Sequence, residues 1–299
     1  MGEPMRGVFP VLQTPVRPDG ELEPADLERE VAFCLEAGVH GLVFPVLGSE
    51  FQFLTDAERH RLVEVVVAAT AGRVPVVVGV AGTTAAEAEE HARQAARARA
   101  DAVIALPPYL ASAGREEIVD YYTRVARAAR LPVFIQHSQA GMDAGLLTQL
   151  LEGIDEVQYV KEEMHPSAHQ ISALLRQVGP ACLGVFGGAH GRWMMSELHR
   201  GATGFMPAVE AIDVHVQVWE AYQAGDEAAA RRLFNRLLPL LNLVLILGLP
   251  LCKAVLVRRG VFSSAAMRTP GSGTLDAEDE RELDRILEDL APLFRAGRR

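Results

Sequence analysis

The chain has 299 residues, of which 49% are hydrophobic and 23% are charged, a composition typical of a soluble globular protein. Its formal net charge of −10 argues against nucleic acid or an anionic membrane surface as a partner. The length is sufficient for one large α/β domain or for two ordinary ones.

The cysteines and the apolar segments indicate a cytoplasmic protein. Cys34, Cys182 and Cys252 lie in apolar segments without CxxC spacing, which predicts buried thiols in a reducing compartment. The first residues lack the basic start and apolar run of a signal peptide. The most apolar stretch, residues 237–251, is interrupted by prolines and is shorter than the ~20 apolar residues that a membrane span needs. We expect it to form a helix pair buried in a core or a subunit interface.

Eight short apolar runs alternate with segments of helical periodicity. The predicted strands are 7–13, 41–46, 74–80, 102–106, 133–137, 157–161, 182–186 and 202–206. The predicted helices are 24–37, 56–71, 84–98, 116–129, 144–151, 169–176, 192–199 and 211–222. The strands are continuously apolar rather than alternating, which indicates burial on both faces, as in a parallel sheet.

Eight βα units at this spacing predict a TIM (β/α)8 barrel over residues 1–224. Residues 225–299 hold about three further helices, interrupted at 270–273, and are predicted to form a C-terminal helical extension. Active sites of such barrels lie at the carboxyl ends of the strands. The residues expected around that mouth are Lys161, Gln136, His137, Gly187, Gly188 and the turn 48–50.

Lysine is scarce in this chain. Lys161 and Lys253 are the only lysines among 29 basic residues, and Lys161 ends an apolar strand directly before Glu162 and Glu163. Arginine would serve any purely electrostatic role, whereas lysine can deprotonate and attack a carbonyl carbon. The alternative is an ordinary strand-end lysine that extends its ammonium into water.

The order of the segments resembles the family of Schiff-base-forming enzymes that contains dihydrodipicolinate synthase and N-acetylneuraminate lyase. The matching segments are Gly7-Val-Phe-Pro, Thr14-Pro15, Leu54-Thr55-x-x-Glu58-Arg59, residues 73–79, Pro107-Pro-Tyr109, the Lys161 strand, Gly201-Ala-Thr-Gly204, Gly225-Asp226, Lys253 and Arg268-Thr-Pro270. The resemblance implies that Lys161 forms an imine with the ketone of pyruvate or another 2-keto acid. An apolar barrel mouth would disfavour the ammonium form and free the amine. The resemblance further implies a homotetramer that needs no cofactor.

The family's Gly-Thr-Thr-Gly-Glu loop binds the carboxylate of the keto acid, and it aligns without gaps with residues 46–50. The resemblance implies that Gly48 and Ser49 offer backbone N–H groups, and Ser49 also a hydroxyl, to that carboxylate. The alternative is a Gly-Ser turn without a binding role.

Departures from the family pattern indicate a changed mechanism. The family's tyrosine after the fifth strand relays protons with a threonine of the carboxylate loop, but these positions hold Gln136 and Leu47 here. The arginine that holds the aspartate-semialdehyde carboxylate in dihydrodipicolinate synthases also has no counterpart. Lysine biosynthesis is therefore not the expected function.

Another acid or base must replace the tyrosine. Lys161 and Glu163 share one face of a strand at positions i and i+2, while Glu162 points to the other face. Glu163 is therefore predicted to be the general acid or base, and His137 at the neighbouring strand end is a second candidate. The alternatives are that Glu163 only orients the lysine and that His137 only lines the pocket or caps a helix.

Three further residues complete the predicted site. Tyr109 matches one aromatic residue of the family's Pro-Tyr-Tyr motif and is expected to border the pocket or to pack at an interface. Gly187 and Gly188 are expected to leave room for the substrate and the lysine.

The histidines show no ligand spacing joined to carboxylates or thiols, so no metal is predicted. The predicted substrate-binding residues are Gly48, Ser49, Gln136, Tyr109, Gly187 and Gly188.

These observations predict a class I lyase that acts on a 2-keto acid, with a 2-keto-3-deoxy sugar acid as the expected substrate. Dehydration is favoured over aldol cleavage, because the missing Tyr/Thr relay would have handled the aldehyde oxygen. One alternative is a condensation of pyruvate with an aldehyde, as in dihydrodipicolinate synthase. Another is a keto-acid-binding barrel without catalytic activity.

Overall fold

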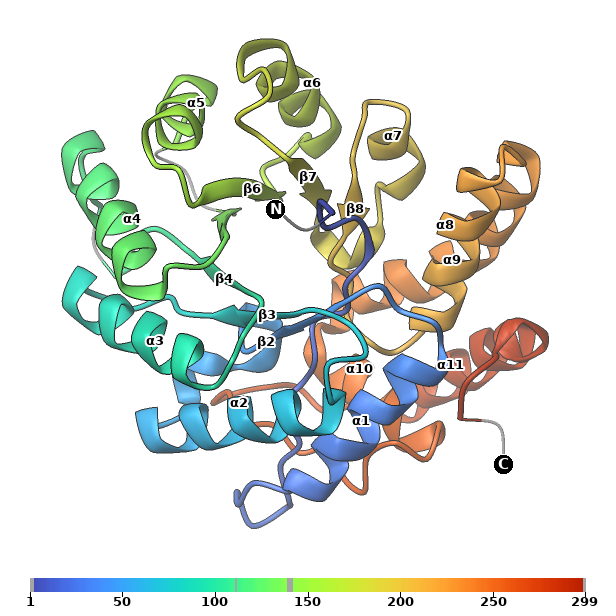
Figure 1. Ribbon diagram of the computed structural model, residues 1–299. Helices are drawn as coiled ribbons and strands as arrows, with labels where there is room; N and C mark the ends of the chain where they lie inside the picture. Colours follow the sequence, from blue (N-terminus) through green and yellow to red (C-terminus); the bar gives the residue numbers. More distant parts are fainter. Residues whose placement is uncertain (1–2, 111, 139–141, 298–299) are drawn as a thin grey trace. The chain divides into compact units, whose positions relative to one another are not determined.

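The computed structural model describes residues 3–110, 112–138 and 142–297, and these contain eight β-strands and eleven α-helices (Figure 1). The strands are β1 Gly7–Val8, β2 Leu42–Phe44, β3 Val76–Gly79, β4 Ala102–Ala105, β5 Val133–His137, β6 Val157–Glu162, β7 Gly184–Gly187 and β8 Gly204–Phe205. The helices are α1 Pro24–Glu36, α2 Asp56–Thr70, α3 Ala85–Arg97, α4 Arg115–Ala129, α5 Ala144–Gly153, α6 Ser167–Gln177, α7 Met194–Leu198, α8 Ile212–Gln223, α9 Glu227–Leu247, α10 Leu249–Arg258 and α11 Ala277–Leu290.

Each predicted strand and helix has a counterpart in the structure, and the largest difference is in the first strand. The predicted run 7–13 keeps regular pairing only at Gly7–Val8, and Val11 forms isolated bridges with Val43 and Ala208. Pro10 interrupts the ladder because proline has no N–H group to donate. Regular strand pairing of β1 thus ends earlier than the apolar pattern predicted.

The chain divides into two compact units. Unit 1 consists of Met1–Phe9 and Pro75–Met206, and unit 2 consists of Pro10–Val74 and Pro207–Arg299. In unit 1 the strands are parallel and follow the order β1-β8-β7-β6-β5-β4-β3. All residues of β3, β4, β5 and β7 are buried, as the continuously apolar strands predicted.

Aromatic side chains fill the inner face of the strands that carry the lysine. The rings of Phe134 and Tyr159 are stacked with centroids 4.4 Å apart, and the Phe186 ring meets Phe134 edge-on at 5.3 Å and Phe9 at 5.2 Å. Tyr159 lies two residues before Lys161 on β6, so strand alternation places the lysine on the same face as these rings.

Unit 2 contains β2, the helices α1, α2 and α8 to α11, and one hydrophobic core that joins α8 with the C-terminal helices. Its buried members are Ala208, Ala211, Val214, Leu237, Leu240, Leu241, Val244, Leu251, Cys252, Ala254, Val255, Leu283, Ile286 and Leu290. The apolar stretch 237–251 forms the end of α9 and the start of α10, as predicted, and Gly248 with a φ of 69° separates the two helices. Residues 225–299 thus share their core with α8.

None of the helices in the described part of the chain combines the length and the apolarity that crossing a bilayer requires.

Helix α2 begins at a capping box that is reinforced by the C-terminal segment. Thr55 accepts a hydrogen bond from the Glu58 N–H, and Glu58 accepts one from the Thr55 N–H in return. Two nitrogens of the Arg268 guanidinium donate to the Glu58 carboxylate at 2.7 and 2.8 Å. The Arg268 guanidinium, together with Thr55, lowers the pKa of Glu58 from 4.5 to about 2.

We predict that this carboxylate contributes to stability only above acidic pH. The pKa of Glu58 is lower in the folded chain than its ordinary value of 4.5, so its contribution is present above pH 4.5 and is lost as the pH falls toward 2. Thermal unfolding of the wild type and Glu58→Gln should therefore differ most above pH 4.5 and converge toward pH 2. A difference that does not change with pH would show that Glu58 acts through its shape alone.

Candidate active site

Lys161 lies near the carboxyl end of β6, opposite Gln136 of β5 and Phe186 of β7. Its Nζ atom is 3.1 Å from Oε1 of Glu163, and the two side chains are only 5% and 18% exposed. The prediction that the two residues share a face is thereby confirmed. A primary amine and a carboxylate thus meet at a strand end, where little water reaches them.

Two further donors fix the Glu163 carboxylate. The side-chain amide of Gln136 donates to Oε2 at 2.9 Å, and the Ala189 N–H donates to Oε1 at 3.3 Å. Burial by itself would raise the pKa of Glu163, but the Lys161 ammonium, Gln136 and Ala189 together hold this pKa below its ordinary value. Glu163 is therefore held as an ionised carboxylate beside the lysine amine.

The glycines after β7 make room for carboxylates. A Cβ atom on Gly188 would collide with Glu163, and one on Gly187 would collide with Glu197. The next two residues, Ala189 and His190, have φ values of 47° and 56°, a left-handed conformation that costs free energy for residues other than glycine. This turn brings the Ala189 N–H to Glu163. In the structure the space beside the two glycines is therefore occupied by glutamate side chains.

His137 and Glu162 form a second pair on the opposite face of the strands. Nδ1 of His137 is 2.8 Å from Oε2 of Glu162, and Nε2 is 2.9 Å from the Met142 carbonyl oxygen. Both side chains are buried, and the Met164 N–H donates to the remaining Glu162 oxygen at 2.8 Å. Because a carbonyl only accepts, Nε2 must carry a proton. The prediction that Glu162 points away from Lys161 is confirmed, and the catalytic role of His137 stays a prediction.

Glu197 of α7 is a buried acid that the sequence interpretation missed. Its side chain is fully buried, and the Ser167 hydroxyl donates to Oε1 at 2.5 Å. Oε2 has no hydrogen-bond partner among the described residues. Burial raises the pKa of Glu197 to about 7, and the charges of Glu162 and Glu163 contribute in the same direction. Glu197 is the single acid of a short apolar helix, and no motif or spacing in the sequence marked it as a site residue.

We predict that Glu197 makes the protein less stable as the pH rises. The pKa of Glu197 is higher in the folded chain than its ordinary value of 4.5. Below pH 4.5 the carboxyl group is protonated in both the folded and the unfolded chain and does not change stability. As the pH rises from 4.5 to 7, the free energy of unfolding falls by about 3 kcal/mol. Glu197→Gln should therefore gain stability relative to the wild type between pH 4.5 and 7. Urea unfolding at several pH values measures this difference, and an offset that is equal at pH 4 and pH 8 would contradict the prediction.

The loop of residues 46–50 belongs to unit 2, where Leu47–Ser49 forms a 3-10 turn. The Ser49 hydroxyl donates to the Leu12 carbonyl at 2.5 Å and accepts from the Val46 N–H at 3.2 Å. The Ser49 N–H donates to the Val46 carbonyl at 2.8 Å. The N–H and hydroxyl groups of Ser49 are therefore engaged by Val46 and Leu12. The N–H groups of Leu47 and Gly48, at the start of the turn, donate to no residue in the described part of the chain.

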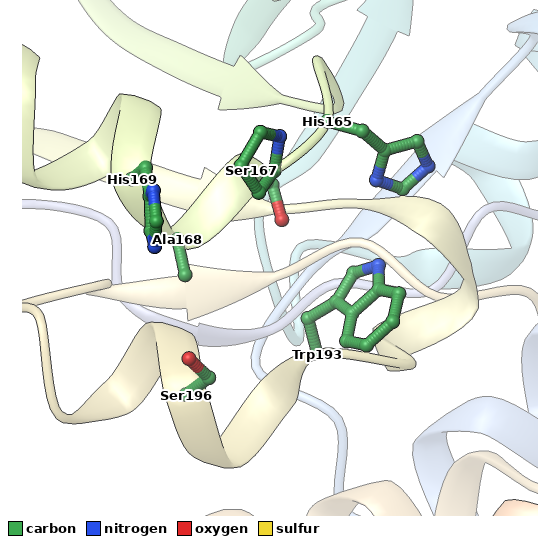
Figure 2. A pocket seen from close by; sticks show the side chains of 7 residues that line it. His165, Ser167, Ala168, His169, Trp193 and Ser196 are labelled. Atoms are coloured by element: carbon green, nitrogen blue, oxygen red, sulfur yellow. The ribbon is translucent and has the colours of Figure 1, made fainter.

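A pocket of about 500 Å³ lies in unit 1 between the start of α6 and α7 (Figure 2). It is lined by His165, Pro166, Ser167, Ala168, His169, Trp193 and Ser196. The His165 and Trp193 rings meet edge-on with centroids 6.0 Å apart. None of the predicted site residues lines this pocket.

Tyr109 is half-buried, between Pro108 and an exposed Leu110, which line a pocket of about 550 Å³ in unit 1. Tyr109 itself is not among the residues that line this pocket. Its proposed contact with a substrate stays a prediction.

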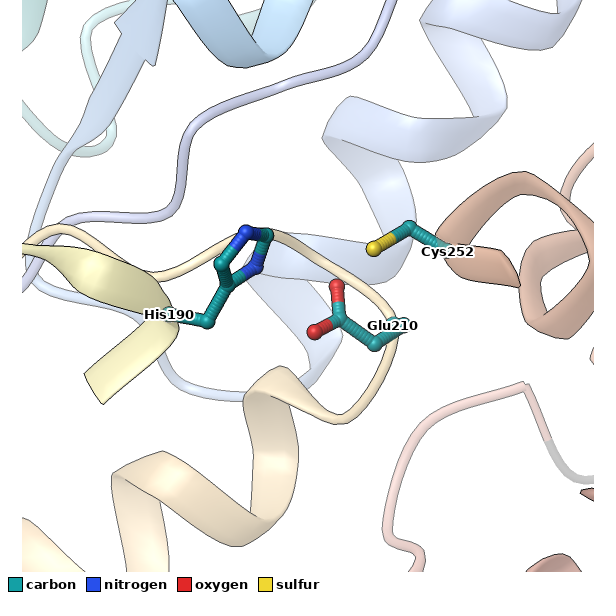
Figure 3. A group of neighbouring side chains, drawn as sticks. All are labelled: His190, Glu210 and Cys252. Carbon is teal, nitrogen blue, oxygen red and sulfur yellow. The ribbon is translucent and has the colours of Figure 1, made fainter. Parts of the chain in front are cut away.

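The three cysteines are free thiols. Cys34 and Cys252 are buried as predicted, but Cys182 is only half-buried, because β7 begins two residues after it. In unit 2 the Cys252 thiol lies beside the Glu210 carboxyl (Figure 3). Burial and the neighbouring Glu210 raise the pKa of Cys252 well above its ordinary value, so the thiol stays protonated. The predicted absence of a bound metal stays a prediction.

Comparisons with known proteins cover nearly the whole chain. The model of the dihydrodipicolinate synthetase family matches residues 4–290. L-2-keto-3-deoxyarabonate dehydratase of Azospirillum brasilense is 32% identical over 297 residues, which are 96% of this chain and 95% of that protein. A probable 2-dehydro-3-deoxy-D-pentonate aldolase of Escherichia coli is 28% identical over 78% of this chain and 80% of that protein.

The likeness extends to solved structures. The crystal structure of a putative dihydrodipicolinate synthetase from Pseudomonas aeruginosa is 28% identical, with a TM-score of 0.89 over 95% of this chain and 99% of that chain. Dihydrodipicolinate synthase from Rhodopseudomonas palustris is 27% identical, with a TM-score of 0.87 over 95% and 97%. The predicted (β/α)8 barrel with C-terminal helices is thereby confirmed.

Proposed function

Because the chain belongs to the dihydrodipicolinate synthetase family and is a class I lyase, we propose that it dehydrates a 2-keto-3-deoxy sugar acid through an imine on Lys161. The observation that carries this proposal is the 3.1 Å contact between Lys161 Nζ and Glu163 Oε1 at the end of β6. It joins the nucleophile that an imine requires with a carboxylate that can move protons beside it.

The first step forms the imine. Glu163 takes a proton from the Lys161 ammonium, and the free amine attacks the C2 carbonyl of the keto acid. Glu163 returns that proton as one water molecule is lost, which gives a protonated imine that withdraws electrons from C3. The family resemblance assigns the keto-acid carboxylate to Gly48 and Ser49, and of these two the Gly48 N–H group has no hydrogen-bond partner among the described residues.

The second step eliminates water. Glu163 removes a proton from C3, and the resulting enamine pushes out the hydroxyl group at C4. That hydroxyl departs as water with the proton that Glu163 returns, and hydrolysis of the imine releases Lys161. The step needs no oxidant and no electron acceptor, because a proton and a hydroxide leave together.

Dehydration is favoured over aldol cleavage by the residue beside Glu163. Gln136 lies at the position where the family resemblance placed a tyrosine, and an amide cannot accept and return a proton as a phenol can. The dehydratase of Azospirillum brasilense, at 32% identity, supports the same choice. Analysis of the products separates the two reactions, because cleavage gives pyruvate and an aldehyde, whereas dehydration keeps the carbon chain intact.

We predict that Lys161 is the residue that forms the imine. Borohydride reduction with pyruvate should add mass to the peptide of Lys161 and leave the peptide of Lys253 unchanged, because Lys253 is paired with Glu50 and is 1% exposed. Lys161→Arg should lose turnover and labelling while it keeps the fold, since the charge remains and the titratable amine is lost. Labelling at Lys253 would overturn the mechanism.

We predict that Glu163→Gln separates imine formation from turnover. The substitution keeps the shape of the side chain but removes the base, so kcat should fall by roughly 10²–10⁴-fold. Trapping of the imine on Lys161 should persist, because the amine that attacks the ketone is unchanged. Turnover close to that of the wild type would assign the proton transfers to another group, with His137 as the next candidate.

We further propose that the enzyme is cytoplasmic, works without a metal or organic cofactor, and assembles into a homotetramer. The support is the family membership and the free thiols of Cys34, Cys182 and Cys252. Its partner is a small 2-keto acid rather than nucleic acid or a membrane. Sedimentation velocity measures the subunit number, and turnover after treatment with EDTA tests the absence of a metal requirement.

A further inference from the structure

Glu163, the proposed base, lies directly after the last residue of β6. The parallel ladders that join β6 to β5 and β7 end at Glu162, which pairs with His137 on one side and Gly187 on the other. The Glu163 N–H donates to the His137 carbonyl oxygen at 2.9 Å. The place of the Glu163 carboxylate beside Lys161 therefore depends on what fixes the chain around residue 163.

The side chain of Glu162 encloses this residue. Oε1 of Glu162 accepts a hydrogen bond from the Met164 N–H at 2.8 Å, so residue 163 lies within a short closed turn. The Glu162 carbonyl oxygen accepts a further bond from the Gly188 N–H at 3.2 Å. The side chain is fully buried, and water cannot replace a partner that a buried carboxylate loses. The turn around residue 163 is therefore held only while Glu162 keeps its own contacts.

His137 supplies the contact on the second oxygen of Glu162. Its Nδ1 atom lies 2.8 Å from Oε2, and its Nε2 atom lies 2.9 Å from the Met142 carbonyl oxygen. The carbonyl only accepts, so Nε2 carries a proton, and the short contact of Nδ1 with Oε2 requires a proton on one of these two atoms. Both ring nitrogens are thus engaged. The imidazole joins the end of β5, the end of β6 and Met142.

We propose that Glu162, held by His137, is a positioning residue that keeps the Glu163 carboxylate in place for removal of a proton from C3 of the bound keto acid. The inference rests on the proposed function, because it assigns that proton transfer to Glu163. Glu162 points to the face of β6 opposite Lys161 and does not touch the reacting atoms. His137 has no nitrogen left to act as the base in this arrangement, and it acts through Glu162.

A positioning role differs from general support of the fold, because its effect passes through one other residue. Loss of Glu162 should slow only the steps that Glu163 performs. In a chain that has already lost the base through Glu163→Gln, loss of Glu162 should therefore cost nothing further. Two independent effects would instead multiply.

Exchange of the C3 protons of pyruvate in D2O isolates the step that Glu163 performs. Once pyruvate has formed the imine, Glu163 takes one proton from C3 and the electron pair of that bond gives the enamine. A deuteron then returns to C3, so the reaction needs no second substrate. Proton NMR measures the maximal rate of exchange and the half-saturating pyruvate concentration.

The principal test is Glu162→Met, which keeps the length of the side chain and removes both oxygens. The maximal exchange rate should fall about 10- to 100-fold, the cost of moving a reacting group by about 1 Å, while the half-saturating concentration changes less than about threefold. In the Glu163→Gln background the same change should lower the remaining rate less than about twofold. An equal fall in both backgrounds, or no fall in the folded variant, would overturn the proposal.

Glu162→Gln separates position from charge. The amide oxygen can accept the Met164 N–H and the amide nitrogen can donate to Nδ1 of a neutral His137, so both contacts are kept. The exchange rate should stay within about threefold of the wild-type value, because the shape that holds Glu163 is retained. A fall as large as that of Glu162→Met would show that the pair of His137 and Glu162 moves protons itself, and it would overturn the positioning role.

Ser167→Ala provides a matched control within unit 1. Ser167 is also the hydrogen-bond partner of a buried glutamate, because its hydroxyl donates to Glu197 at 2.5 Å. This variant should lose thermal stability, while the exchange rate stays at the wild-type value. A fall equal to that of Glu162→Met would attribute both effects to lost stability and would contradict the proposal.

Glu162→Asp keeps the test decisive if Glu162→Met does not fold. Aspartate keeps the charge beside His137 but is one methylene shorter, so it cannot reach His137 and the Met164 N–H together. The exchange rate should fall about 3- to 10-fold, and this fall should vanish in the Glu163→Gln background. An unchanged rate would refute the positioning role. If borohydride and pyruvate do not label Lys161 of the wild type, the proposed function itself fails, and the inference fails with it; labelling of the wild type together with independent effects of Glu162 and Glu163 refutes the positioning role alone.

Discussion

The contact between the Lys161 ammonium and the Glu163 carboxylate is the interaction on which the candidate site depends. Two opposite charges removed from water need further hydrogen bonds to offset their desolvation, and loss of one partner typically costs about 3–5 kcal/mol. The amide of Gln136 and the N–H of Ala189 supply those bonds. The left-handed turn after β7 and the glycines that admit the carboxylate are therefore consequences of one requirement.

The two lysines of the chain form the same kind of ion pair with a glutamate, and the two pairs differ in how deeply they are buried. Lys253 and Glu50 are 1% and 2% exposed, and the Lys253 ammonium also donates to the Ala266 carbonyl oxygen. Lys161 is 5% exposed and its partner Glu163 is 18% exposed, so this second pair is less completely buried. The proposed mechanism assigns the nucleophile to the less buried of the two pairs.

Local patterns predicted the features that depend on neighbouring residues in the chain. The βα succession followed from apolar runs, and the shared face of Lys161 and Glu163 followed from the two-residue period of a strand. Glu197 and the internal bonds of the Ser49 hydroxyl were not predictable in this way, because their partners lie 30 and 37 positions away in sequence. The pair of Lys253 and Glu50 spans 203 positions, so only the folded chain reveals it.

Gln136 stands where the family resemblance implies a tyrosine, and this difference changes which group can carry a proton. A phenol donates and accepts at one oxygen, so it can pass a proton between substrate and solvent, whereas the glutamine amide only donates through nitrogen and accepts through its carbonyl. In this chain the amide donates to Glu163, which fixes one carboxylate oxygen and leaves the other beside Lys161. In the proposed mechanism the proton transfers that surround imine formation therefore converge on one carboxylate. Elimination suits such a site, because the proton removed from carbon and the proton given to the leaving hydroxyl can pass through the same group.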